Sequence, residues 1–159
     1  MQARTAGLTW RPEWAGGRGF LQARAALSKD VRAKALRRYL AAPPDGASAN
    51  GVTLGLALLA QGRLLGPKST VHLLTLMRSS RTGPLRLKSG LRPGWTLAHK
   101  TGTQHERACN VGIAYFAPER PVVVAVCTEK FSSRKKAEGT IADVARALTG
   151  FIRPSSSKR

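Results

Sequence analysis

The sequence predicts an α+β fold in which helices pack on an antiparallel sheet. Residues 1–94 carry mainly helical patterns, whereas residues 95–152 carry strand-like segments followed by one more helix. Short turns separate the strand-like segments, which favours antiparallel neighbours. We therefore expect a mainly helical segment (1–94), a sheet and C-terminal helix of the same fold (95–152), and a basic tail (153–159).

Three helices are expected in the first half of the chain. Leu21–Ala41 is rich in alanine and arginine, which are good helix formers, and a Pro-Pro-Asp-Gly turn ends it. Thr53 is expected to cap a second, leucine-rich helix that ends before Gly66. A third helix runs from about Pro67 to Arg78, with proline in its first turn. Residues 79–94 show no clear period and are expected to form a loop.

Three strands and a helix are expected after this loop. Trp95–Thr103 and Ala108–Phe116 contain many residues that favour pleated structure. After an Ala-Pro-Glu-Arg turn, Pro121–Cys127 is an unbroken apolar run, typical of a strand covered on both faces. From Arg134 the period changes to three and four residues, which predicts a helix. The apolar face of this helix is expected to consist of Ile141, Val144, Ala145, Leu148 and Ile152.

A Lys-Thr-Gly triplet, Lys100 to Gly102, closes the first strand and is followed by Thr103. A cation and a hydroxyl on an exposed strand edge can hold a substrate carboxylate, and the glycine lets a substrate lie against the backbone. Penicillin-recognising serine enzymes carry such a triplet on the strand that lines their active site. Three residues alone are weak evidence, so the surrounding segments decide how the triplet is interpreted.

The triplet is one of nine short segments that follow one another in a fixed order along the chain. They are Leu64–Ser69, Leu73–Met77, Thr82-Gly83, Arg86-Leu87, Gly90-Leu91, Pro93–Trp95, Lys100–Thr103, Asn110–Ile113 and Arg120–Val126. In this order they resemble the C-terminal half of a class A β-lactamase, over roughly residues 50–152. The ordered series is much more specific than the triplet.

The resemblance implies a serine hydrolase that opens β-lactam rings through an acyl-enzyme, without a cofactor or metal. Lys100 would favour an anionic substrate electrostatically and help proton transfer, and Thr101 would hydrogen-bond the substrate carboxylate. The backbone N–H of Thr103 would supply half of the oxyanion hole, and Gly102 would keep the strand edge open. The resemblance also implies a β-lactam or related small-molecule substrate, export to the periplasm or medium and, for a complete domain, a monomer.

The family's nucleophile, a serine in a Ser-x-x-Lys motif, has no match before Lys100. The matches Ser132–Lys135, Ser133–Lys136 and Ser155–Lys158 follow the triplet in Ser/Lys-rich stretches, and we interpret them as non-catalytic. We therefore expect this chain to be the C-terminal portion of such an enzyme. The nucleophile would lie upstream, and the chain alone would not turn over a β-lactam.

Two further family elements are matched poorly. The Ser-Asp-Asn motif is absent, and the looser Ser48-Ala49-Asn50 lies in turn-like sequence before a helix, so we interpret it as a turn. Class A enzymes use a glutamate on a surface loop to activate the hydrolytic water. Glu13 is the only glutamate before the strands, but a solvated loop carboxylate is the favoured interpretation.

The cysteines and histidines do not predict a metal site. Cys109 and Cys127 are expected nearly opposite each other in a hairpin. An exported protein could join them, but buried free thiols are commoner at such positions, so we expect free thiols. His72, His99 and His105 lack ligand partners at useful spacing.

Composition leaves two alternatives open. The chain has 27 basic and 8 acidic residues, a net charge of +19, which suits nucleic-acid binding. The charges are dispersed, however, and no zinc-finger or RNA-recognition signature accompanies them, so this function is disfavoured. The second alternative is a non-catalytic penicillin-binding-like module. A hydrophobic fraction of 42% argues against global disorder, and no apolar segment approaches the roughly 20 residues that span a bilayer.

Overall fold

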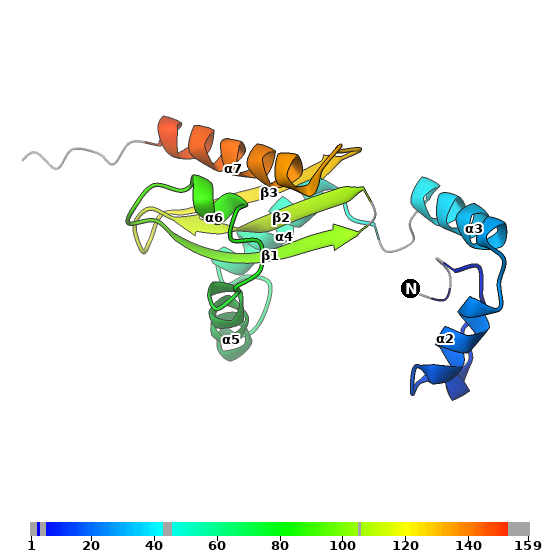
Figure 1. The fold of residues 1–159 in the computed structure, drawn as a ribbon. Coiled ribbons are helices and arrows are strands. Elements are labelled where there is room, and N and C mark those ends of the chain that lie inside the picture. Colours follow the sequence, from blue (N-terminus) through cyan, green and yellow to red (C-terminus); the bar gives the residue numbers. More distant parts are fainter. Residues whose placement is uncertain (1–2, 4–5, 43–45, 105, 153–159) are drawn as a thin grey trace, which may run out of the picture. The chain divides into compact units, whose positions relative to one another are not determined.

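The computed structural model describes residues 3, 6–42, 46–104 and 106–152. The chain divides into two compact units, residues 1–47 and 48–159. In the second unit, helices pack on a three-stranded antiparallel sheet (Figure 1). The expected α+β class is therefore confirmed.

The first unit contains a 3₁₀ helix, η1 (Pro12–Trp14), and two α-helices, α2 (Arg18–Ala25) and α3 (Lys29–Ala41). The single helix expected over residues 21–41 is wrong. Ser28 separates the two helices because its Oγ accepts a hydrogen bond from the Val31 N–H at 3.2 Å, which caps the start of α3.

The second unit begins with three helices, has three strands in its middle and ends with a fourth, longer helix. Its elements are α4 (Ala49–Ala60), α5 (Pro67–Arg78), α6 (Leu87–Gly90), β1 (Thr96–Gln104), β2 (Arg107–Tyr115), β3 (Pro121–Glu129) and α7 (Arg134–Phe151). The strand order is β1-β2-β3, so β1 is an edge strand. The expected strands and the helix from Pro67 to Arg78 are confirmed, but the loop expected over residues 79–94 is interrupted by α6.

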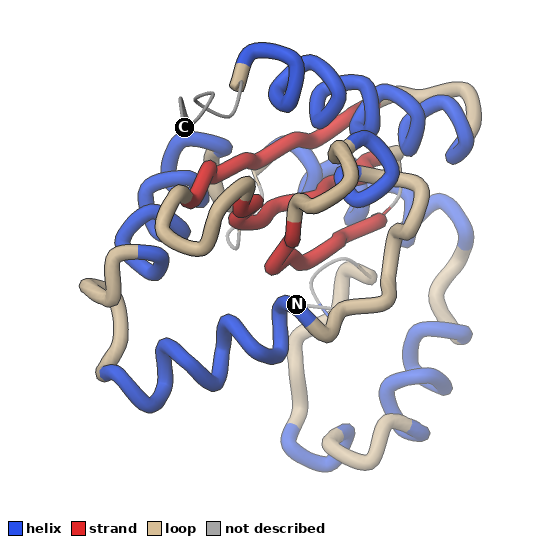
Figure 2. Tube along the Cα trace, turned by 90° about the vertical axis from the view of Figure 1, so that its left-hand side faces the viewer, coloured by secondary structure: helices blue, strands red, loops and turns tan. Residues whose placement is uncertain are grey.

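Helices cover both faces of the sheet (Figures 1 and 2). Helix α7 contacts β2 and β3 on one face and α6 packs against it, whereas α4 and α5 contact the strands on the other face. The core between α6, α7 and the sheet consists of Leu87, Ala108, Ala137, Ile141 and Ala145. Gly90 lets α6 approach α7 closely, since a Cβ there would lie 2.0 Å from the Ala142 carbonyl oxygen.

Two expected helix details are wrong. Helix α4 begins at Ala49 rather than at Thr53, because the Ser48 Oγ accepts from the Gly51 N–H at 3.0 Å and caps it. Val144 of α7 is 39% exposed, whereas Glu138 is buried, because the face that packs on the sheet is centred on Ile141.

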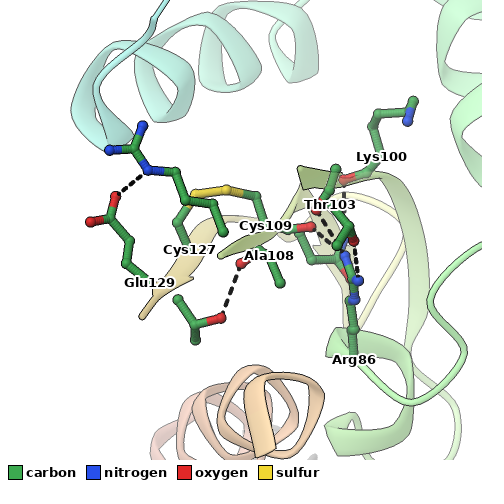
Figure 3. Close-up of a disulfide and its surroundings, with 11 residues drawn as sticks. Arg86, Lys100, Thr103, Ala108, Cys109, Cys127 and Glu129 are labelled. Atoms are coloured by element: carbon green, nitrogen blue, oxygen red, sulfur yellow. Dashed lines mark hydrogen bonds and ion pairs between the residues drawn. A yellow bond between two sulfur atoms is a disulfide. The ribbon is translucent and has the colours of Figure 1, made fainter. Parts of the chain in front are cut away.

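Cys109 and Cys127 form a disulfide between β2 and β3 (Figure 3). The expectation of free thiols is wrong. The two residues are direct partners in the β2–β3 register, and their Cα atoms are 4.1 Å apart. Directly opposed residues in an antiparallel pair lie close enough for their sulfur atoms to bond.

Among the residues that the structure describes, no helix is long and apolar enough to cross a membrane. The same residues contain no group of three or more His, Cys, Asp or Glu side chains that could hold a metal ion. His105 lies outside the described residues.

Candidate active site

The Lys-Thr-Gly triplet lies in the middle of the edge strand β1 and does not close it as expected, because the strand and its pairing with β2 continue to Gln104. Side chains of a strand alternate between its two faces. Lys100 is exposed, its ammonium donates to the Thr101 carbonyl, and it lies on the opposite side of β1 from Arg86 (Figure 3). A Cβ added at Gly102 would meet no atom within 4 Å, so the space beside this residue is open.

The loop after α5 packs on the triplet. The hydroxyls of Thr82 and Thr101 are hydrogen-bonded at 2.6 Å, and the Ser80 hydroxyl continues the chain to Thr82 at 3.2 Å. Gly83 has a positive φ of 60°, and a Cβ there would approach the Thr101 methyl group to 2.8 Å. Glycine therefore suits both the backbone conformation and the close contact.

Arg86 connects β1, β2 and α7, a role that the sequence pattern does not assign to it. Its side chain is 1% exposed and donates to the carbonyls of Gly102 at 3.1 Å and Cys109 at 2.9 Å (Figure 3). It also donates to the Thr103 hydroxyl at 2.5 Å and pairs with Glu138 at 3.3 Å. No periodic pattern marks a buried arginine in a loop, so only the fold reveals it.

Asn110 holds the neighbouring part of β1. Its side-chain amide donates to the Lys100 carbonyl at 3.2 Å and to His99 Nδ1 at 3.0 Å, and its Oδ1 accepts from the Leu87 N–H at 3.4 Å. Burial lowers the pKa of His99 below its ordinary value of 6.5, and the positive charges of Lys88 and Lys100 lower it further. His99 is thus a packed residue of the sheet, 3% exposed.

The lowered pKa of His99 predicts a loss of stability in acid. Between the folded pKa and 6.5 the unfolded chain binds more protons at this site, so stability falls as the pH decreases through that range. The urea midpoint of the wild type should drop between about pH 7.5 and pH 5, and the drop should be smaller in His99→Gln. The variant at exposed His72, His72→Gln, should keep the wild-type dependence. An unchanged drop in His99→Gln would remove His99 from the explanation.

Two of the other candidate serines cap helices. The Ser133 Oγ accepts from the Lys136 N–H at 3.2 Å and caps α7. Ser48 caps α4, as described above, which fits its interpretation as a turn residue. Glu13 is in the first unit, where it is exposed and lies 3.9 Å from Arg11. The third Ser-x-x-Lys match, from Ser155, lies outside the described residues.

Comparison with known proteins decides the family. The model of the β-lactamase enzyme family matches residues 19–152. The chain belongs to the β-lactamase enzyme family. The resemblance seen in the ordered segments is thereby confirmed, and the family match extends into the first unit.

Individual known proteins are similar to about two thirds of this chain. A β-lactamase of Mycobacterium tuberculosis is 29% identical over 106 residues, which are 66% of this chain and 34% of that protein. A Rhodopseudomonas palustris protein, PenP, described as a class A β-lactamase, has a TM-score of 0.65 at 31% identity, covering 69% of this chain and 43% of that one. A mutant of PBP-A in an acyl-enzyme complex with penicillin G has a TM-score of 0.59 at 27% identity, covering 65% and 39%.

The chain thus spans about a third of the length of the Mycobacterium β-lactamase and less than half of the two solved structures. None of these three relatives is described as a nucleic-acid-binding protein.

Proposed function

We propose that this chain supplies the β1 side of an active site that hydrolyses β-lactams through an acyl-enzyme. Membership of the β-lactamase family carries this proposal. The position of the triplet on an edge strand supports it, because an edge strand leaves backbone groups free for a substrate. The acyl-enzyme of PBP-A with penicillin G is an example of such chemistry in a similar fold.

Each residue of the triplet, and Thr103 after it, has a separate role in this proposal. Lys100 attracts the anionic substrate and helps proton transfer, while the Thr101 hydroxyl binds the substrate carboxylate. The exposed position of Lys100 and the fixed hydroxyl of Thr101 support these tasks. The Thr103 N–H stabilises the oxyanion, an interaction whose loss typically costs about 3 kcal/mol of transition-state stabilisation. The open space beside Gly102 supports its role in admitting the substrate.

Arg86 is the positioning residue of this edge. It binds the Gly102 carbonyl and the Thr103 hydroxyl from the side opposite Lys100, so it fixes the two residues that follow Thr101. A fixed strand edge matters because an oxyanion-hole donor works only when it is aimed at the developing charge.

The nucleophile in this proposal is a serine of a Ser-x-x-Lys motif outside this sequence. The capping role of Ser133 supports this assignment, since its hydroxyl is already engaged with the α7 backbone. We therefore propose that this chain alone neither forms the acyl-enzyme nor hydrolyses β-lactams. We also propose export to an oxidising compartment, which the Cys109–Cys127 disulfide supports.

The first experiment incubates the purified chain with a fluorescent penicillin and maps any adduct by mass spectrometry. No adduct is expected. A chimera then joins this chain to the part of the Rhodopseudomonas protein that precedes the matched segment, and this chimera should hydrolyse penicillin. Lys100→Ala in the chimera should lower kcat/KM by about 100-fold or more, because it removes the cation of the triplet, next to the proposed carboxylate-binding Thr101.

Lys68→Ala is the matched control, since Lys68 is an exposed lysine at the start of α5. It should leave kcat/KM of the chimera unchanged. An adduct on a serine of the unfused chain would contradict the external nucleophile. A chimera that is acylated by penicillin equally fast with and without Lys100 would contradict the proposed site on β1.

A further inference from the structure

A cavity lies at the start of β1, and its lining ends at His99, one residue before the triplet. It has a volume of about 550 Å³, within the usual range for small-molecule sites. Its walls come from the end of α5, from α6 and the loop that follows it, and from the first residues of β1. The chain segments are held together here by His99, which is hydrogen-bonded to Asn110 and to the backbone of Ser80.

The titratable side chains that line this cavity are three cations and His99, whose pKa is lowered by burial. Arg78, Lys88 and Arg92 contribute to its walls, and no Asp or Glu does. In the described part of the chain, no salt bridge includes any of these three cations. A concave surface lined by one sign of charge concentrates the field and attracts a counter-ion. The contribution of Lys88 to the lowered pKa of His99 is consistent with a positive potential at this end of the strand.

The same cavity offers a flat apolar surface. Trp95 lines it and is only half-buried, and its ring packs against Phe116 with centroids 5.3 Å apart. Leu91 and Leu97 add aliphatic contacts. The Trp95 ring is held by Phe116 and lies in the same cavity as the cations, so the cavity suits a ligand that has both a ring and an anionic group.

We propose that this cavity binds a small organic phosphate in which a phosphate monoester is attached to an aromatic ring. Lys88 and Arg92, which form no salt bridge with another described residue, line the cavity together with Arg78, so a dianion is favoured over a monoanion. A phosphate monoester carries close to −2 charge above about pH 7. The ring would stack on Trp95. This site is separate from the proposed hydrolysis at the triplet and does not depend on it.

The test is a titration of the isotopically labelled full chain with phenyl phosphate, monitored by nuclear magnetic resonance. The chain has three tryptophans, and the indole signal of Trp95 is the one that disappears in Trp95→Phe. Phenyl phosphate should shift the Trp95 signal saturably and leave the signals of Trp10 and Trp14 unchanged. Inorganic phosphate and benzoate should bind at least about tenfold more weakly, a difference of about 1.4 kcal/mol. Neutral benzyl alcohol should not shift the signal.

The double variant Lys88→Gln/Arg92→Gln should weaken phenyl phosphate binding at least about tenfold, because both exposed cations are removed. The control Lys68→Gln/Lys135→Gln removes two exposed lysines that do not line the cavity and should change affinity by less than about twofold. Equal loss in both double variants, tight binding of benzyl alcohol or benzoate, or a Trp95 signal that does not saturate would overturn the proposal. Unchanged signals elsewhere in the spectrum verify that each variant is folded.

Discussion

Replacing Arg86 by methionine is expected to lower the free energy of unfolding by about 3 kcal/mol, at the lower end of the range for breaking a buried ion pair. Arg86 is 1% exposed and bonds to Glu138, to two backbone carbonyls and to a hydroxyl, so its loss removes the donor from the partly buried carbonyls of Gly102 and Cys109 and from the Thr103 hydroxyl. The expected cost is at the lower end because Arg134 still pairs with Glu138 at 3.1 Å.

Urea unfolding monitored by Trp95 fluorescence, in a Trp10→Phe/Trp14→Phe background, measures this effect in the second unit. The control Arg134→Met removes the exposed partner of the same glutamate and should cost less than about 1 kcal/mol. The double variant Arg86→Met/Glu138→Leu should regain part of the loss, since it removes both members of the buried pair. Equal effects of Arg86→Met and Arg134→Met would show that burial of Arg86 has no energetic importance.

Removing the disulfide is the second large effect. Cys109→Ala/Cys127→Ala should lower the free energy of unfolding by about 3 kcal/mol, the value expected from the entropy of closing a loop of this length. The two cysteines are 18 residues apart and join β2 to β3. The Cys109 carbonyl also accepts from Arg86, so the disulfide restrains one of the contacts that fix the strand edge.

The same urea experiment, with and without reductant, measures this contribution. The wild type under reducing conditions should unfold near the midpoint of the double alanine variant, and the variant itself should not respond to reductant. A wild type whose midpoint is insensitive to complete reduction would contradict a stabilising role of the Cys109–Cys127 bond. If the proposed export is correct, expression in an oxidising compartment should also give the more stable form.

The strands and the long helices were predictable because they depend on local patterns. Pro121–Cys127 is apolar throughout, and Pro67 marks the start of α5, so each pattern indicates its own element. The break at Ser28 was missed because alanine and arginine continue on both sides of it, and a capping serine does not interrupt a composition-based signal.

The features of the candidate site also fall into those that the sequence predicts and those that only the fold reveals. The sequence by itself determined the family, the Lys-Thr-Gly triplet and its position on a strand, because these depend on residue identity and order along the chain. Only the tertiary structure revealed that Arg86 lies buried behind Gly102 and Thr103, that Cys109 is joined to Cys127, and that Lys88 and Arg92 border one cavity. These features join residues distant in sequence, and such contacts are set by how helices and strands pack rather than by any local period.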